Sequence, residues 1–210
     1  MKRLENILKK RDCTAKAVQE KNMISQHEML RLVRERLSDK RFEHTLRVMK
    51  EAKKLAPILG ADAEKANIAA LLHDVTKHMP AHEQLNYCEK AGIILGVVEK
   101  NEPKILHAIT GGLLARDLCG IEDEDILNAV RYHTTGRAGM SPLEKTIYLA
   151  DYIEEGRDFP GVDGLRKAVY EDINKGLLKA FDNSIWEVMQ KGAMIHPDTI
   201  EGRNDVLLRR

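Results

Sequence analysis

Six potential metal ligands lie between positions 44 and 151 of this chain. In chain order they are His44, His73, Asp74, His107, His133 and Asp151. Histidine is a common metal ligand and carboxylate oxygen suits harder ions, so a mixed set indicates Fe, Mn, Mg or Zn. Four histidines and two acids facing one interior would be costly to bury without a positive charge between them. The residue types therefore predict a metal centre, provided that the fold brings the six side chains together.

The adjacent pair His73-Asp74 follows two apolar residues, Leu71 and Leu72. Neighbouring residues of a helix point about 100° apart, so both can reach one ion only from a helix end or edge. Lys77 would lie one turn further along the same face as His73. A cation there repels a metal unless an anion lies between them, and phosphate is the natural candidate. Taken alone, the pair also fits a helix-end histidine that is hydrogen-bonded to a nearby acid.

His107 lies in the segment KILHAITGGLLA, whose Gly111-Gly112 pair allows a helix or a ligand to pack closely against the backbone. Taken alone, this histidine also fits a hydrogen-bonded core residue. Asp151 follows an apolar run, and Arg157 comes six residues later. A lone aspartate in that place also fits a helix cap or the partner of an arginine. The pattern of the whole set, rather than any single position, favours ligands.

His133 ends a helical pattern and is followed by the run Thr134-Thr135-Gly136-Arg137. Hydroxyls, a free glycine N–H and a guanidinium are groups that bind phosphate oxygens. The run therefore predicts phosphate contacts beside a ligand. The remaining histidines among polar neighbours, His27, His78 and His82, are interpreted as surface residues.

The composition narrows the class of protein. Lys+Arg number 34 against Asp+Glu 33, so the balance gives no support for nucleic-acid binding. Three cysteines without a CxxC spacing suit reduced thiols in a cytoplasmic protein. No apolar run approaches the roughly 18 residues that span a membrane, and the N-terminus lacks the apolar region of a secretory signal. We expect a soluble cytoplasmic protein.

Helical periodicity dominates, and the aromatic content of 4% disfavours an extended sheet. Capping residues divide the chain into expected helices. Helices are expected after Ser25, from Ser38 to a stop near Pro57 and Gly60, after Asp62, from Ala81 to Gly92, from Pro103 to Gly120, from Glu122 to Tyr132, after Ser141, as one long stretch after Asp163, and after the His196-Pro197-Asp198 turn. The expected fold class is all-α.

Four segments carry a family resemblance: EHTLRV at 43–48, ALLHDVTKHMP at 70–80, the block from 131 to 166, and IHPDTIEGRN at 195–204. The ordered set His44, His73-Asp74 and Asp151 resembles the HD-domain superfamily of metal-dependent phosphohydrolases. The longer segments are similar to its YqeK-type members, symmetrical bis(5'-nucleosyl)-tetraphosphatases that cut diadenosine tetraphosphate into two ADP. The resemblance implies a compact multi-helix HD-domain bundle over residues 38–210, preceded by an N-terminal helical extension at 1–37.

The resemblance also implies roles for residues. His44, His73, Asp74 and Asp151 match the shared metal ligands, and His107 and His133 match two extra histidines that serve a second metal or the phosphates. The expected catalytic cations are Lys77, Arg137 and Arg157. The expected nucleotide-binding residues are His44, Lys77, His107, His133, Thr134, Thr135, Gly136, Arg137, Asp151, Arg157, Met194, Ile195, His196, Pro197, Asp198 and Thr199. The implied cofactor is one or two metal ions per chain, iron first, with Mn, Mg and Zn as alternatives.

The expected reaction is hydrolysis of the phosphoanhydride by metal-bound hydroxide, since no serine or cysteine stands in a triad-like context. The expected partners are a dinucleoside polyphosphate and its ADP product. Neither nucleic acid nor a membrane is expected as a partner. The sequence leaves the oligomeric state open, and a homodimer is one of the alternatives. Two other functions remain open: an HD phosphohydrolase that acts on another nucleotide, and a non-catalytic nucleotide-sensing module. A purely structural helical protein is a third alternative.

Overall fold

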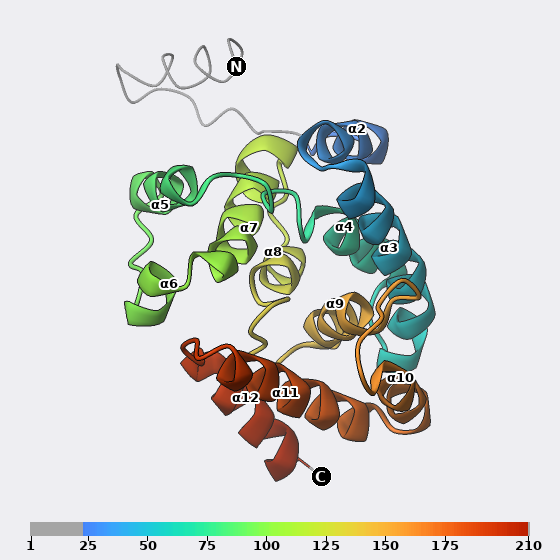
Figure 1. Cartoon of the computed structure of the whole chain (residues 1–210). Coiled ribbons are helices and arrows are strands. Elements are labelled where there is room, and N and C mark those ends of the chain that lie inside the picture. Colours follow the sequence, from blue (N-terminus) through green and yellow to red (C-terminus); the bar gives the residue numbers. More distant parts are fainter. Residues whose placement is uncertain (1–22, 210) are drawn as a thin grey trace, which may run out of the picture.

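The computed structural model describes residues 23–209, and within that range every regular element is a helix (Figure 1). The helices are α2 (Gln26–Arg36), α3 (Asp39–Leu59), α4 (Ala63–Leu72), α5 (Ala81–Lys90), α6 (Val97–Asn101), the 3-10 helix η1 (Pro103–Ile105), α7 (Leu106–Cys119), α8 (Glu124–Arg131), α9 (Pro142–Ile153), α10 (Val162–Glu171), α11 (Ile173–Gln190) and α12 (Pro197–Leu208). The expected all-α class is confirmed.

Helix starts coincide with the predicted capping residues. Ser25 and Ser141 each form a complete capping box with the glutamate three residues later. Ser38 and Asp62 accept hydrogen bonds from the first-turn N–H groups of α3 and α4. These caps satisfy N–H groups that have no partner inside the helix, so local sequence fixes where each helix begins.

Helix α4 lies at the centre of the core, and it packs against α2, α3, α7, α8 and α9. Ala69, Ala70, Leu71 and Leu72 are all fully buried there. Because α4 is buried on nearly all sides, its C-terminal end opens into the middle of the bundle rather than into solvent. The residues that follow Leu72 are therefore delivered to the interior.

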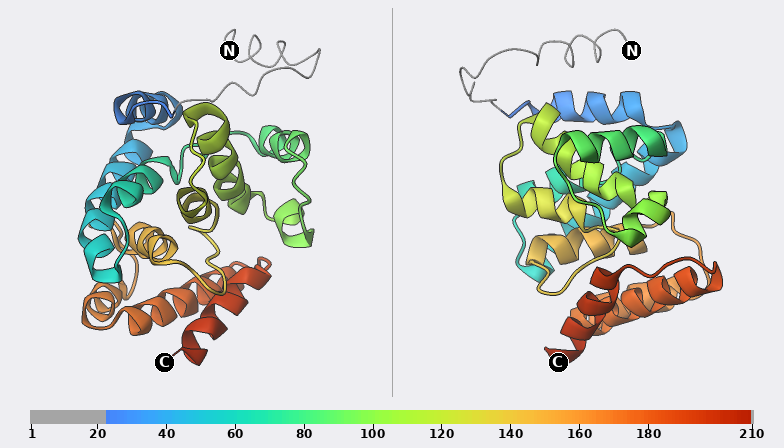
Figure 2. Two further views of the ribbon diagram at one scale, coloured as in Figure 1. Left: turned by 180° about the vertical axis from the view of Figure 1, so that it is seen from behind. Right: turned by 90° about the vertical axis from the view of Figure 1, so that its left-hand side faces the viewer.

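Helices α10, α11 and α12 form a second layer that packs on α9 (Figures 1 and 2). Phe181 of α11 stacks on Tyr148 of α9, with ring centroids 4.9 Å apart, and both side chains are buried. Gly202 of α12 lies against Phe181 so closely that a Cβ would come within 2.8 Å of the ring. This layer anchors α9 and the N-terminus of α12.

The expected end of the helix after Ser38 is confirmed: Pro57 lies in the last turn of α3, which ends at Leu59 with Gly60 as its left-handed cap. Two other features differ from the expected helices. The stretch after Asp163 is two helices, because Asp172 is extended and caps the start of α11. The short helix α6 was not expected. A proline in the last turn loses only one backbone hydrogen bond, which explains why α3 tolerates it.

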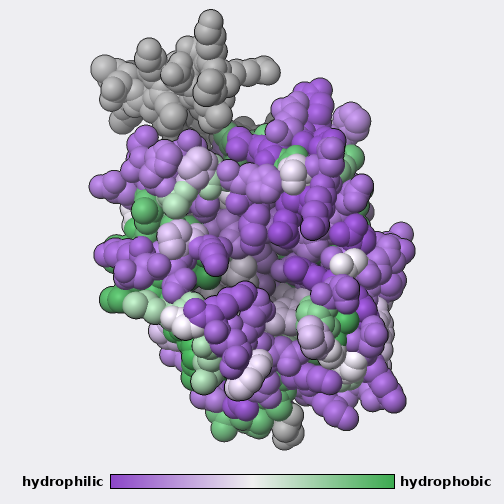
Figure 3. All heavy atoms as spheres, viewed as in Figure 1, coloured by the Kyte–Doolittle hydropathy of each residue, from purple (hydrophilic) through white to green (hydrophobic). Residues whose placement is uncertain are grey.

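The predicted extension at 1–37 lies partly outside the described residues, because the structure describes nothing before residue 23. Its described part, α2, packs on α3 and α4, and Met29 and Val33 are buried in the same core as those helices. No helix within residues 23–209 has the length and apolar character needed to cross a bilayer. Hydrophilic side chains cover most of the face in Figure 3.

Candidate metal centre

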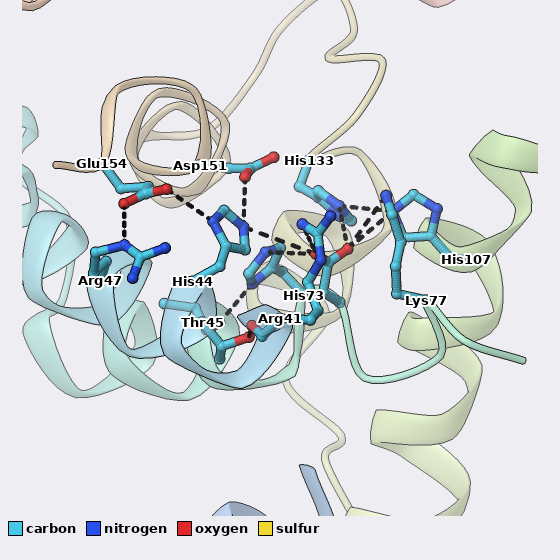
Figure 4. Close-up of polar contacts among 12 residues, drawn as sticks. Arg41, His44, Thr45, Arg47, His73, Lys77, His107, His133, Asp151 and Glu154 are labelled. Atoms are coloured by element: carbon cyan, nitrogen blue, oxygen red, sulfur yellow. Dashed lines mark hydrogen bonds and ion pairs between the residues drawn. The ribbon is translucent and has the colours of Figure 1, made fainter. Parts of the chain in front are cut away.

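The six predicted ligands come together in one cluster, and Figure 4 labels His44, His73, His107, His133 and Asp151. His44 lies in the second turn of α3, and the pair His73-Asp74 follows the last residue of α4. His107 lies in the first turn of α7, with His133 just after α8 and Asp151 near the end of α9. The pair reaches the centre from a helix end, as its adjacency requires.

The ligand atoms lie close enough to share ions. One ligand atom each from His44, His73 and Asp151 lies within 4.8 Å of the others, and the same holds for His73, Asp74 and His133. His44 Nε2 is 3.0 Å from Asp151 Oδ1. His107 joins the cluster because its Nε2 lies 3.2 Å from Asp74 Oδ1. The geometry thus forms one connected set.

All four imidazoles present the same nitrogen to the centre. His73, His107 and His133 each place Nδ1 within 2.6–2.7 Å of a backbone carbonyl oxygen three residues earlier in the chain. His44 Nδ1 lies 3.1 Å from Glu154 Oε1 instead. Because these oxygens only accept, every Nδ1 carries the proton and every neutral ring offers its Nε2 lone pair inward. That tautomer is the one a metal needs at Nε2.

Several inward-facing atoms are buried and make no hydrogen bond of normal geometry. They are His44 Nε2, His73 Nε2 and Asp74 Oδ1. Buried polar atoms normally have hydrogen-bond partners, so three such atoms around one point indicate a site for a cation. Imidazole nitrogens and carboxylate oxygens are the donors that iron, manganese and zinc accept. The residues present therefore fit a metal ion.

The protonation states also suit metal binding. Burial would raise the pKa of Asp74, but the charge of His73 and the other imidazoles around the carboxylate hold it well below its usual value. Burial likewise opposes ionisation of Asp151, but Arg157, His44 and His73 together outweigh it and hold that pKa well below its usual value. Burial lowers the pKa of His107 to about 4. At neutral pH both acids are charged and this imidazole is neutral.

Cations occupy the solvent side of the cluster. Lys77 Nζ lies 3.0 Å from His107 Nε2 and 3.5 Å from Asp74 Oδ1. Lys77 belongs to the turn after α4, not to a continuation of that helix as expected. The Arg157 guanidinium donates to the carboxylate of Asp151 and, at 2.7 Å, to its carbonyl oxygen. The side chains of Lys77 and Arg157 are about one-third exposed, so they can meet a ligand from solvent.

Three charged residues at the site were missed in the sequence. Arg41 donates to Asp74 Oδ2 at 2.9 Å, Arg47 donates to Glu154 Oε2 at 2.6 Å, and Glu154 receives His44 Nδ1–H. Arg41 and Arg47 lie three residues before and after the ligand His44, and Glu154 lies three residues after the ligand Asp151. That spacing puts them on the ligand's own helix face and was the available signal.

The loop after His133 differs from its expected role in one respect. The Gly136 N–H is not free, because it donates to the carbonyl of Tyr132 at 2.8 Å, and a Cβ at Gly136 would overlap the Phe181 ring. The Arg137 guanidinium forms a two-pronged pair with the buried carboxylate of Glu144 and lies 4.6 Å from the Tyr132 ring. Structural contacts thus occupy both groups.

Other predicted nucleotide residues line an open hollow. Thr134 and Thr135 form one wall, while His196 and Asp198 at the start of α12 form another. Glu99 of α6 lines the same hollow, and its Oε1 lies 3.2 Å from His196 Nε2. Met194, Ile195, Pro197 and Thr199 belong to the same segment as His196. His27, His78 and His82 are exposed, as predicted.

Comparison with known proteins identifies the family. The sequence pattern of the HD domain matches residues 41–156, the segment that carries all six ligands. The chain belongs to the HD domain family. It is 42% identical over 176 residues to the symmetrical bis(5'-nucleosyl)-tetraphosphatase of Bacillus subtilis (strain 168), covering 84% of this chain and 94% of the relative. It is 40% identical to the enzyme of the same name from Halalkalibacterium halodurans, covering 86% of this chain and 96% of the relative.

A solved structure shares the HD domain fold with this chain. It is described as a predicted HD superfamily hydrolase involved in NAD metabolism from Clostridium acetobutylicum. The two chains are 46% identical with a TM-score of 0.87, over 90% of this chain and 100% of the other. The predicted HD-domain bundle is confirmed.

Proposed function

We propose that this chain hydrolyses dinucleoside tetraphosphates symmetrically, converting diadenosine tetraphosphate and water into two ADP. One observation carries the proposal: six ligand side chains from five helices meet with their metal-binding atoms turned inward. The relatives at 40–42% identity carry the name of that activity over nearly their whole length. An HD-type hydrolase of a phosphoanhydride explains both.

His44, His73, Asp74 and Asp151 would hold one metal ion, and His107 and His133 would complete a second site that shares Asp74. The position of Asp74 supports this division, since its Oδ2 lies 3.5 Å from His73 Nε2 and its Oδ1 lies 3.2 Å from His107 Nε2. A bound ion lowers the pKa of a coordinated water toward about 7 and so supplies a nucleophile at neutral pH. Iron is our first choice, with manganese, magnesium and zinc as alternatives.

The cations around the centre would bind the phosphates. Lys77 and Arg157 are partly exposed. Lys77 contacts Asp74 and Arg157 contacts Asp151, so an anion bound at the centre would contact both cations. Fixed positive charge aimed at the reacting phosphoryl group stabilises the transition state and costs no reorganisation. Arg41, which donates to Asp74, adds a third cation on the solvent side.

The hollow lined by Thr134, Thr135, His196 and Asp198 would take one nucleoside diphosphate half of the substrate. Thr134 directly follows the ligand His133, so a phosphate chain can run from the metal centre into this hollow. The Thr134 hydroxyl is buried and makes no hydrogen bond, which leaves it free to donate to a ligand. We further propose that the enzyme works in the cytoplasm.

Product identification tests the proposal. Metal-loaded protein is incubated with diadenosine tetraphosphate, and the products are separated by ion-exchange chromatography. ADP as the only product is the expected result. AMP and ATP in equal amounts would mean asymmetrical cleavage, and no product would favour a nucleotide-sensing module.

The same assay should include other nucleotides. The solved relative is described as involved in NAD metabolism, so dinucleotides with a single pyrophosphate are the relevant competitors. Deoxynucleoside monophosphates and cyclic dinucleotides cover the other HD phosphohydrolase substrates. A higher kcat/KM on any of these than on the tetraphosphate would replace the proposed substrate.

A further inference from the structure

A third carboxylate of the site, Glu154, faces away from the centre and toward the back of His44. Its Oε1 lies 3.1 Å from His44 Nδ1, and its Oε2 accepts from Arg47 Nε at 2.6 Å and from the Gly156 N–H at 2.5 Å. The side chain is only 2% exposed. Figure 4 shows Glu154 between His44 and Arg47. Both of its oxygens are used by groups of the protein.

The loop that carries Glu154 is held firmly. Arg166 donates to the backbone carbonyls of Ile153, Glu154 and Arg157, at 2.8–3.0 Å. Gly156 leaves room for Arg47, since a Cβ there would overlap its guanidinium. Several long-range contacts thus converge on one carboxylate, although Glu154 touches none of the other ligands.

His44 differs from the other three histidines of the cluster. Their Nδ1 protons point to backbone carbonyls, which are acceptors whatever the sequence. His44 depends on a side chain for the same purpose. We infer that Glu154 is a positioning residue, which fixes the Nδ1–H tautomer and the ring orientation of His44, and that Arg47 and the Gly156 N–H hold Glu154 in place. This inference rests on the proposed function, which makes His44 a metal ligand.

Glu154→Gln tests the inference with almost no change in shape. The two donors from Arg47 and Gly156 both face the Oε2 position, so the glutamine carbonyl should take that place. The glutamine NH2 then faces His44 Nδ1, which must become an acceptor. The ring proton moves to Nε2, the atom that would bind the metal. We expect a metal affinity about 10- to 100-fold lower at this site, the range typical of residues that orient metal ligands.

The readouts do not depend on turnover. Mn²⁺ binding to metal-free protein is measured by the EPR signal of the free ion, and the tautomer of His44 by ¹⁵N NMR of the imidazole nitrogens. Glu51→Gln is the matched control, because Glu51, in α3, is also a buried carboxylate but bonds to Lys54 and Tyr170 instead of to a ligand. It should bind Mn²⁺ as the wild type does.

Three outcomes separate this inference from the proposed function. Weaker Mn²⁺ binding in Glu154→Gln, with the His44 proton on Nε2 and a normal Glu51→Gln, supports the inference. Wild-type affinity and tautomer in Glu154→Gln overturn it, provided that His44→Ala loses Mn²⁺. Absence of Mn²⁺ and Fe²⁺ binding to the wild type would instead overturn the metal site of the proposed function.

Discussion

Asp74 Oδ1 lies 3.2 Å from His107 Nε2, while the other oxygen of the same carboxylate lies 3.5 Å from His73 Nε2. One carboxylate therefore faces both halves of the ligand set. His44 and His133 stand slightly further away, each with Nε2 at 3.8 Å from one of these oxygens. Asp74 thus contacts all four imidazoles of the ligand set, so its loss should affect the whole centre.

We expect Asp74→Ala to abolish hydrolysis and lower the metal content while the fold survives. Asp74 is not part of the apolar core, so the helices should remain by circular dichroism. A bound metal provides several kcal/mol of transition-state stabilisation, which corresponds to a loss on the order of a thousand-fold in kcat/KM. Asp163→Ala, at an exposed helix start, is the control. Near-normal turnover of Asp74→Ala would show that the ligand assignment is wrong.

Removal of the metal should lower thermal stability. The centre holds buried groups that lack hydrogen bonds without an ion, so the ion binds the folded chain far better than the unfolded one. Metal at 100 times its Kd stabilises by about 2.7 kcal/mol, or roughly 5–10 °C for a chain of this size. Melting curves of chelated and reloaded protein measure the difference. The Asp74→Ala variant should show little of it, and an equal shift there would point to metal bound elsewhere.

Lys77→Ala should reduce turnover without removing the metal. Its ammonium lies 3.0 Å from His107 Nε2 on the partly exposed side of the centre, in reach of a bound phosphate. Loss of one preorganised transition-state contact costs about 10²–10³ in kcat. Lys50→Ala, an exposed lysine of α3 paired with Glu155, is the control. If Lys77→Ala lost metal as well as activity, elemental analysis would assign the lysine to metal binding instead.

Arg137→Ala should cost stability more than activity. Its guanidinium pairs with Glu144, whose side chain is 1% exposed, so the substitution leaves a buried carboxylate without its partner. We expect a loss of about 2–3 kcal/mol in the free energy of unfolding, less than the 3–5 of fully buried pairs because Arg137 is one-third exposed. Urea unfolding measures it, with Arg203→Ala as a surface control. A large fall in kcat at unchanged stability would support the catalytic role expected from the sequence.

The helix starts could be predicted because their signals are local. Ser25, Ser38, Asp62 and Ser141 each cap the first turn that follows them, and nothing distant changes that preference. Asp172 was missed because an aspartate inside a helical pattern is ambiguous without knowledge of its neighbours. The end of α3 could also be predicted, because Gly60 is a local stop signal one turn after Pro57.

The ligands could be predicted because six metal-binding side chains in one order match a family pattern. The partners that orient them could not, since each depends on a contact between distant parts of the chain. Glu154 meets Arg47 across 107 positions, and Arg41 meets Asp74 across 33. The hydrogen bond of the Gly136 N–H could not be predicted either, because its acceptor is the backbone carbonyl of Tyr132, which no side-chain pattern indicates.

The stability of the metal-free protein should fall as the pH falls from 6.5 to 4. Burial lowers the pKa of His107 from its usual 6.5 to about 4, and burial also lowers the pKa of His133. Between these pH values the unfolded chain binds a proton at His107 and the folded chain does not. Protonation therefore favours the unfolded state, by roughly 3 kcal/mol for His107 across the whole window.

Other groups of the centre do not reverse this trend in the same window. The pKa of Asp74 and Asp151 lies well below the usual value, so their contribution is lost only at lower pH, as protons reach the folded carboxylates. Despite the opposing effect of burial, the pKa of His73 is raised by Asp74, so its contribution is complete below pH 6.5. Urea unfolding of chelated protein at pH 6.5, 5.5 and 4.5 measures the slope. His107→Asn should flatten it. A flat wild-type profile would mean that His107 is protonated in the folded protein.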